Sequence, residues 1–167
     1  MKKITSEAMV RLLGNFCQAH PLAPVFKAGY SYDVGDFSQD AAYPLLFLRL
    51  PLFYSATAER ASQAIVVCNF EIQVLTRIQQ QARADFDRLR QIDEMVGIAA
   101  DLYSLLAGND AWRMGLFAQS FQVESEIETA TPDEPVGCRA TFALASTQND
   151  LACYIEELPS LIDLYSC

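Results

Sequence analysis

The stretch QAIVVCNFEIQVLTRI, residues 63–78, alternates between apolar and polar side chains through its central part. The apolar side of this alternation carries Cys68, Phe70, Ile72 and Val74, and the polar side carries Asn69, Glu71 and Gln73. A period of two residues is that of a β-strand with one face in the core and the other in water. We therefore predict a long strand here, in a sheet that has one solvated face.

Three more segments predict strands: residues 43–52 (YPLLFLRLPL), residues 121–130, and residues 138–147 (CRATFALAST). The first is apolar between two prolines, as expected of a mostly buried strand. Ser55, Ala56 and Thr57 form a connector from it to the alternating strand. The linker TPDEPVG, residues 131–137, joins the other two strands. Both pairs are close enough in sequence to form antiparallel hairpins.

Two segments have the apolar period of an amphipathic helix. Residues 5–20 begin at the candidate N-cap Thr5 and end at Pro21. Residues 83–107 are long enough for about seven turns, and Gly108 supplies a C-terminal stop. The apolar stripe predicted for this second helix comprises Phe86, Leu89, Ile92, Val96, Ala99, Tyr103 and Leu106.

The order of these segments predicts an α+β fold. Residues 22–43, rich in aromatic residues and glycine, predict an ordered loop with one short strand around Tyr30–Val34. The order α-β-β-α-β-β favours one mainly antiparallel sheet of about four main strands, with two helices packed on one face. We expect residues 1–148 to form a single domain. Residues 149–167 are too apolar to stay in solvent, so we expect a C-terminal tail docked on the domain or on a neighbour.

Charge and cysteine content exclude several functional classes. Twelve Lys and Arg against 21 Asp and Glu leave a net charge of −9, which disfavours binding to nucleic acid or to anionic membranes. No segment reaches the roughly 20 apolar residues of a membrane-spanning helix. The N-terminus lacks the pattern of a secretory leader, so we expect a cytoplasmic chain. The five scattered cysteines are expected to be reduced.

The candidates for chemistry are few. His20 is the only histidine, and Cys17, three residues earlier, is its conceivable partner in a nucleophilic pair. Glu124, Glu126 and Glu128 form an acidic row on one face of a predicted strand, which is most simply its solvated side. Loops for phosphate binding and motifs for metal binding are absent from the sequence. We therefore expect no cofactor, no metal and no enzymatic activity.

The order of elements resembles the tail-terminator proteins of long-tailed bacteriophages and the related head-to-tail joining proteins. The resemblance covers residues 4–148. It lies in an N-terminal helix, the strand in DFSQDAAYPLLFLRLP, the strand QAIVVCNFEIQVLTRI, one central helix, and the hairpin from QSFQVESEIETATP to GCRATFALAST. A longer connection between the first two strands and the tail after Thr147 depart from the family pattern.

The resemblance implies a structural virion component assembled in the host cytoplasm. Such proteins form a homo-oligomeric ring, commonly a hexamer, that caps the tail tube and contacts tail-tube and neck or connector proteins. DNA passes through the ring without specific binding, and no catalytic residues carry over. As contact or lumen elements we name the acidic row Glu124, Glu126 and Glu128, together with Leu158 and Leu161 of the tail.

Two other interpretations of the sequence stay open. One is a small intracellular module that holds an apolar ligand or a protein, with the ligand between sheet and helix and with Tyr30, Tyr32 and Trp112 near the mouth. The other is an enzyme that uses the glutamate row as general acid and base. A closed ring in solution favours the structural protein, whereas a strict monomer favours the binding module.

Overall fold

A computed structural model of the chain describes residues 4–22, 24–30, 42–59, 63–77, 85–108, 116–126 and 135–146, and every structural statement concerns these residues. The elements are α1 (Ser6–Ala19), β1 (Val25–Tyr30), β2 (Leu45–Leu50), β3 (Phe53–Glu59), β4 (Gln63–Arg77), α3 (Asp85–Ala107), β5 (Leu116–Glu126) and β6 (Pro135–Ser146). Both long helices and the four main predicted strands are present, so the α+β class is confirmed.

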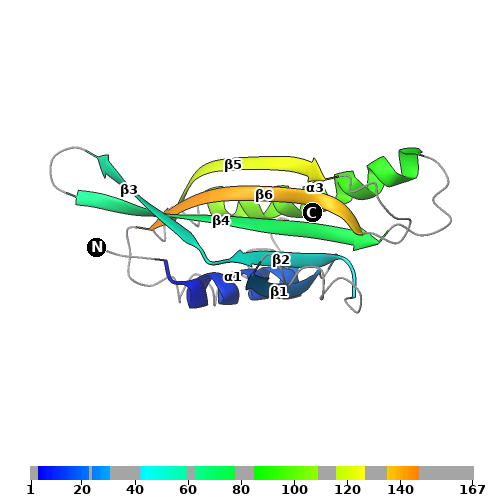
Figure 1. The fold of residues 1–167 in the computed structure, drawn as a ribbon, viewed down its shortest axis with the longest axis horizontal. Helices are drawn as coiled ribbons and strands as arrows, with labels where there is room; N and C mark the ends of the chain where they lie inside the picture. The colour runs from blue at the N-terminus through cyan, green and yellow to red at the C-terminus, as the bar shows by residue number, and fades with distance from the viewer. Residues whose placement is uncertain are drawn as a thin grey trace.

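The six strands form one sheet built around β4 (Figure 1). The strand order is β1-β2-β4-β6-β5, and β3 also pairs with β4. β2 pairs with the second half of β4 and β3 with its first half, while β6 runs along the opposite edge of β4. The prediction of a long strand over residues 63–78 is confirmed, because β4 is 15 residues long.

The first edge of the sheet differs from the prediction. We expected a loop over residues 22–43, but Val25–Tyr30 form β1, which pairs in parallel with β2. The short strand predicted at Tyr30–Val34 overlaps β1 at Tyr30, and its other residues, with the rest of 31–41, lie outside the described part. The sequence VFKAGY does not alternate between apolar and polar residues, and the burial of its side chains follows no period of two either. Pairing with β2 therefore determines this strand more than its own sequence does.

A second strand was also missed, which raises the strand number from about four to six. Ser55, Ala56 and Thr57 were predicted to be a connector, but they lie in β3. Ser and Ala, which make up most of this short segment, are weak indicators of a strand. The first half of β4 pairs along this edge with β3, and this pairing satisfies backbone groups that would otherwise need water.

The β3–β4 hairpin extends beyond the rest of the sheet. Within the described residues, β6 pairs with β4 from Val67 onward, whereas β3 continues to pair as far as Glu59 and Gln63. Residues 56–59 and 63–66, which we call the β3–β4 arm, therefore form a ribbon of two strands in the described structure. Figure 1 shows this arm projecting from one end of the molecule.

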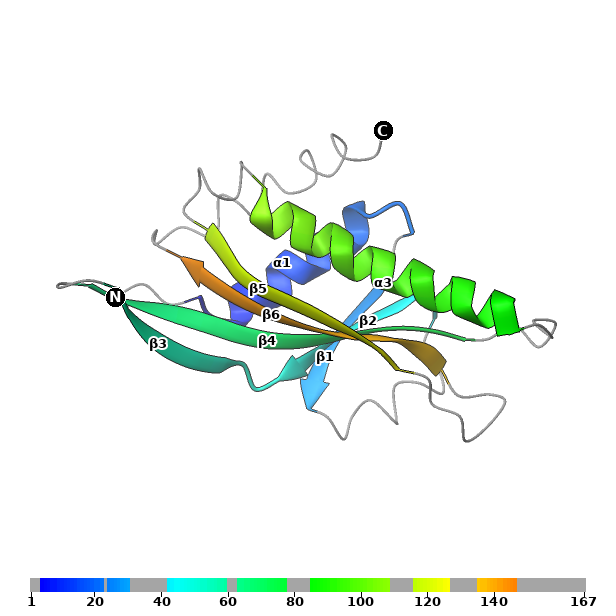
Figure 2. The same cartoon turned by 90° about the horizontal axis from the view of Figure 1, so that it is seen from above.

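Both helices pack on the same face of the sheet, as predicted (Figure 2). α1 begins at Thr5, whose Oγ1 accepts a hydrogen bond from the backbone N–H of Ala8 at 3.1 Å. This is the N-cap that the sequence predicts. α3 crosses β4, β6 and β5. No helix in the described residues is long and apolar enough to cross a membrane.

An aromatic row connects α3 to the sheet. Tyr103 of α3 stacks on Phe121 of β5, with ring centroids 4.7 Å apart. Phe121 lies 5.0 Å from Phe142 of β6, and Phe142 stacks on Phe70 of β4 at 4.8 Å. Aromatic pairs of this kind contribute about 0.5–1.5 kcal/mol each beyond the burial of their area. This row therefore fixes where the helix sits across three strands.

The apolar stripe of α3 is shorter than predicted. Ile92, Ala99 and Leu106 are buried, but Phe86 is 82% exposed and Leu89 is 49% exposed. Figure 2 shows that the first turns of α3 reach past the ends of β5 and β6. The helical period predicts which side of the helix is apolar, but it does not predict where the sheet underneath ends.

Candidate functional site

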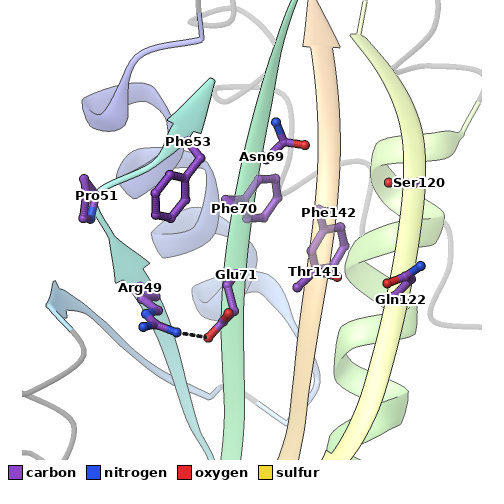
Figure 3. Close-up of a pocket in the computed structure, with 10 residues that line it drawn as sticks. All are labelled: Arg49, Pro51, Phe53, Asn69, Phe70, Glu71, Ser120, Gln122, Thr141 and Phe142. Atoms are coloured by element: carbon purple, nitrogen blue, oxygen red, sulfur yellow. Dashed lines mark hydrogen bonds and ion pairs between the residues drawn. The ribbon is translucent and has the colours of Figure 1, made fainter. Parts of the chain in front are cut away.

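The face of the sheet opposite the helices, which we call the outer face, carries the polar side of each central strand. Register places Glu71 of β4 beside Thr141 of β6, and Thr141 beside Gln122 of β5. Arg49 of β2 approaches Glu71 from the other side (Figure 3). Strand alternation thus gathers polar side chains from four strands on one surface.

This surface contains a hollow of about 240 Å³, which we call the outer-face hollow. Phe53, which is 66% exposed, and Pro51 line one side of it where β2 gives way to β3. The full lining is Arg49, Pro51, Phe53, Asn69, Phe70, Glu71, Ser120, Gln122, Thr141 and Phe142 (Figure 3). The hollow therefore combines an exposed aromatic ring with hydrogen-bonding groups and one guanidinium.

Glu71 holds two arginines over this surface. Its Oε1 accepts a hydrogen bond from Nη1 of Arg49 at 3.1 Å, and Nε of Arg139 lies 3.6 Å from the same oxygen. Ion pairs as exposed as these contribute about 0.2–1 kcal/mol to stability. Their main effect is on position, since one carboxylate orients two guanidiniums above the strands.

The outer face is more basic than the chain as a whole. Register and alternation place Lys27, Arg49, Arg77 and Arg139 on it. The guanidinium of Arg77 lies over the ring of Tyr43, 5.3 Å from the centroid. Among residues whose side chains are described, the opposing carboxylates on this face are Glu71 and Glu124. In a chain of net charge −9, this face is a locally basic surface.

The predicted acidic row is described only in part. Glu124 is exposed on the outer face, and its register partner is Arg139. Glu126 is the last residue of β5. Glu128, Leu158 and Leu161 lie outside the described residues. Glu124 is thus exposed in the single chain. Contacts with other subunits through this row or the tail stay predictions.

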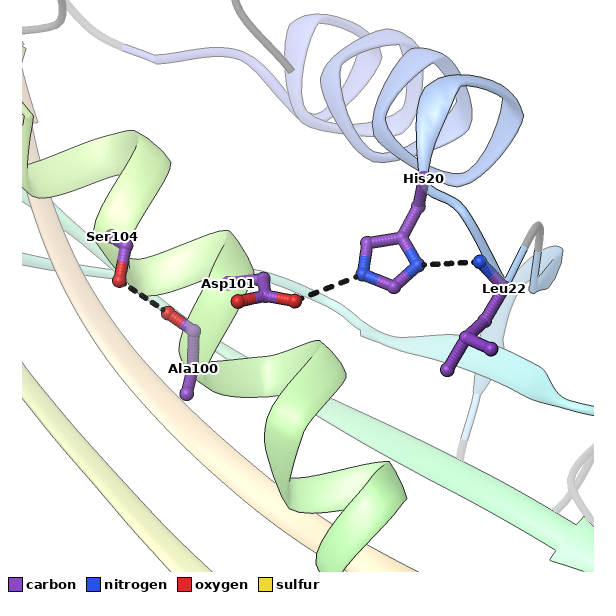
Figure 4. Close-up of polar contacts among 5 residues, drawn as sticks. All are labelled: His20, Leu22, Ala100, Asp101 and Ser104. Carbon is purple, nitrogen blue, oxygen red and sulfur yellow. Dashed lines mark hydrogen bonds and ion pairs between the residues drawn. The ribbon is translucent and has the colours of Figure 1, made fainter. Parts of the chain in front are cut away.

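His20 links the two helices (Figure 4). Its ring is buried, and Nδ1 accepts a hydrogen bond from the backbone N–H of Leu22 at 3.2 Å. This acceptor role places the proton on Nε2 in the neutral ring, which donates to Oδ2 of Asp101 at 3.1 Å. The ring also packs against Phe16, with centroids 5.2 Å apart. Both ring nitrogens are thus used in joining the end of α1 to α3.

Cys17 does not form a reactive pair with His20. The Cys17 side chain is buried in the core, and this burial raises its thiol pKa to about 12. The thiol therefore stays protonated near neutral pH, and a protonated thiol is a poor nucleophile. Cys68 and Cys138 are also buried and form no disulfide within the described part of the chain, as expected of reduced thiols, while Cys153 and Cys167 lie outside the described residues.

The described residues bring together no group of three or more His, Cys, Asp or Glu that could hold a metal ion. Of the residues named for the mouth of a ligand site, Tyr30 is exposed at the end of β1, and Tyr32 and Trp112 lie outside the described part. The outer-face hollow is on the other side of the sheet from the layer where the sequence suggested a ligand.

Sequence reasoning missed the outer-face hollow. The signals for it were Arg49 within an otherwise apolar strand and Phe53 directly after a proline segment. Neither is specific without the strand register. No protein-family model matches the chain, and no curated protein matches it.

Proposed function

We propose that this chain is a ring-forming structural subunit, a tail terminator or neck protein of the kind that its sequence resembles. In this role, copies of the chain would cap a tail tube and join it to the head. The observation that carries the proposal is the β3–β4 arm, which leaves the body of the subunit as a ribbon of two strands.

A two-stranded ribbon is only marginally stable by itself in water. The arm has the register of a regular hairpin, pairing Ala56 with Val66 and Glu59 with Gln63. β6 does not extend along it in the described residues. A surface of a neighbouring subunit would add packing to this two-stranded ribbon.

The two ends of the molecule offer different surfaces, as a ring requires. The arm projects at one end of the long axis, and the first turns of α3, with exposed Phe86 and Leu89, lie toward the other (Figure 1). Contacts between two different surfaces run head to tail, and they give a closed ring when the rotation between subunits closes. Two different ends are compatible with such a head-to-tail ring.

Charge and chemistry support the same proposal. A net charge of −9 suits a ring through which DNA passes without being gripped. The His20 ring nitrogens are both engaged, and the Cys17 thiol is protonated near neutral pH, so these two residues serve packing. A structural role is consistent with the environments of both the His20 ring and the Cys17 thiol.

The alternative is a small α+β module that binds a ligand or a protein. The observation that favours it is the outer-face hollow, which combines exposed Phe53 with oriented Arg49 and Glu71. A chain that stays monomeric at high concentration and binds a partner through this hollow would fit this second function.

The experiment compares the full chain with an arm-shortened variant by size-exclusion chromatography and light scattering. Residues 57–65 are replaced by Asn-Gly, which closes a two-residue hairpin between the paired residues Ala56 and Val66. We expect the natural chain to run as one discrete oligomer and the variant as a smaller species with an unchanged circular dichroism spectrum. A natural chain that is monomeric up to high concentration would contradict the proposal.

A further inference from the structure

We infer that the outer-face hollow binds one unit of a neutral saccharide. This site goes beyond the proposed subunit ring, because it assigns a ligand to a face of the sheet that the proposal leaves without a role. Its parts are an exposed aromatic ring, polar side chains aligned by the strand register, and a lining whose two charges are paired with each other.

The hollow lies along two rows of register partners on the outer face. In the first row, Phe53 of β3 lies beside Asn69 of β4. Ala143 of β6 follows beside Asn69, and Ser120 of β5 lies beside Ala143. Alanine and serine have short side chains, so this row is tall at Phe53 and low toward β5. A ligand can therefore lie on the sheet with one side against the Phe53 ring (Figure 3).

The second row supplies hydrogen-bonding groups. It lies two residues further along the strands, about 7 Å away, and consists of Glu71, Thr141 and Gln122. The Asn69 amide of the first row is held by its own bond, from Nδ2 to Oγ of Ser55 at 3.0 Å. Amide, hydroxyl and carboxylate groups together offer both donors and acceptors. The hydroxyls of a sugar, each of which donates and accepts, match such a mixed set.

The charges of the lining favour a neutral ligand. Nη1 of Arg49 lies 3.1 Å from Oε1 of Glu71, and these are the two charged residues among the described residues that line the hollow. Arg139, 3.6 Å from the same oxygen, is not part of this lining. An ionic ligand would have to compete with one member of the Arg49–Glu71 pair for the other. A sugar hydroxyl, in contrast, can bond to either group while the pair stays intact.

Phe53 supplies the apolar half of the site. Its side chain is 66% exposed, and the face of an aromatic ring carries partial negative charge. The C–H groups on one face of a sugar ring carry partial positive charge, so they pack on an aromatic face while the hydroxyls at the rim point away from it. A purely apolar ligand would cover the polar lining without bonding to it, which costs free energy. The lining therefore favours a ligand with one apolar face and a polar edge.

The size of the hollow admits one sugar unit. Its volume is about 240 Å³, below the roughly 300–1,000 Å³ of typical small-molecule pockets. At about 30 Å³ for each water in the liquid, the hollow has room for about eight waters. One monosaccharide unit fills such a space, and further units of a longer chain would extend into solvent. Few contacts in an open site give weak binding, so we expect dissociation constants of about 1–10 mM.

Saturation-transfer difference NMR on the full chain tests this site, because the method detects weak ligands of large and oligomeric proteins. The probes are the methyl glycosides of glucose, galactose, mannose and N-acetylglucosamine, and acyclic sorbitol is the control ligand without a ring face. Phe53→Ala removes the aromatic face, and Phe53→Trp keeps one. Phe86→Ala is the matched control variant, because Phe86 is 82% exposed on α3 and does not line the hollow. Circular dichroism checks the fold of each variant.

We expect a saturable signal from at least one glycoside and none from sorbitol. Phe53→Ala should raise the dissociation constant at least about tenfold, whereas Phe53→Trp and Phe86→Ala should leave it within about twofold. The inference is overturned if none of these glycosides gives a saturable signal, if sorbitol gives an equal one, or if Phe53→Ala leaves the signal unchanged. Light scattering on the same samples reports the oligomer, so such a failure leaves the proposed subunit ring standing.

Discussion

Two glycine substitutions of opposite expected sign test the packing at the centre of the sheet. A Cβ added at Gly137 would overlap the carbonyl oxygen of Val74 and would come within 3.0 Å of the Cα of Leu75. These atoms are backbone of the adjacent central strand, so they can give way only if the β4–β6 ladder shifts. Overpacking of this kind typically costs about 1–3 kcal/mol, and we expect Gly137→Ala near the upper end of that range.

Gly97→Ala is the matched control. Gly97 lies inside α3, and a Cβ added there meets no atom within 4 Å. Replacing glycine by alanine in a helix interior reduces the entropy lost on folding, so this variant should be more stable by about 0.5–1 kcal/mol.

Urea unfolding followed by circular dichroism measures both variants, at a concentration where all proteins share one oligomeric state. With a slope of about 1–3 kcal/mol per molar urea, Gly137→Ala should lower the midpoint by about 1 M or more, and Gly97→Ala should raise it slightly. A Gly137→Ala protein as stable as the natural chain would refute the register in which β4 pairs with β6.

Two further predictions concern the inner layer. Burial raises the Cys17 pKa from 9.0 to about 12. Between these two pH values the unfolded chain has lost a proton that the folded chain retains. The free energy of unfolding should therefore fall with rising pH, by up to about 1.4 kcal/mol per pH unit. Denaturation from pH 8 to 11 should show this slope in the natural chain but less of it in Cys17→Ala, and equal slopes would contradict the burial of the thiol. His20→Ala removes the contacts to Asp101 and Leu22 and should cost about 1–2 kcal/mol, whereas Asp101→Asn keeps an acceptor oxygen and should cost less. Thermal unfolding decides the order of these two variants, and the reverse order would contradict the described bridge.

The parts of the fold with a strong internal period could be predicted from the sequence. β4 alternates over its central residues, and α3 carries an apolar residue at each turn, so local chemistry alone indicates their type. β1 and β3 have no such period. Their strand conformation comes from pairing with β2 and with the first half of β4, which is information about distant residues.

The candidate site was less predictable for the same reason. Arg49 and Arg139 lie on the strands at either side of Glu71. Only the strand register brings both guanidiniums to the Glu71 carboxylate. The periodic stripe of α3 suggested that Phe86 and Leu89 were core residues. Their exposure depends on the length of the strands beneath the helix, which no pattern within α3 records.

Negative-stain electron microscopy of the purified full chain tests the proposed assembly most directly. A ring of subunits predicts annular particles of uniform diameter with a central opening, and it predicts their loss in the arm-shortened variant. Grids without annular particles, from a sample that light scattering shows to be monomeric, would contradict the ring and would favour the binding module.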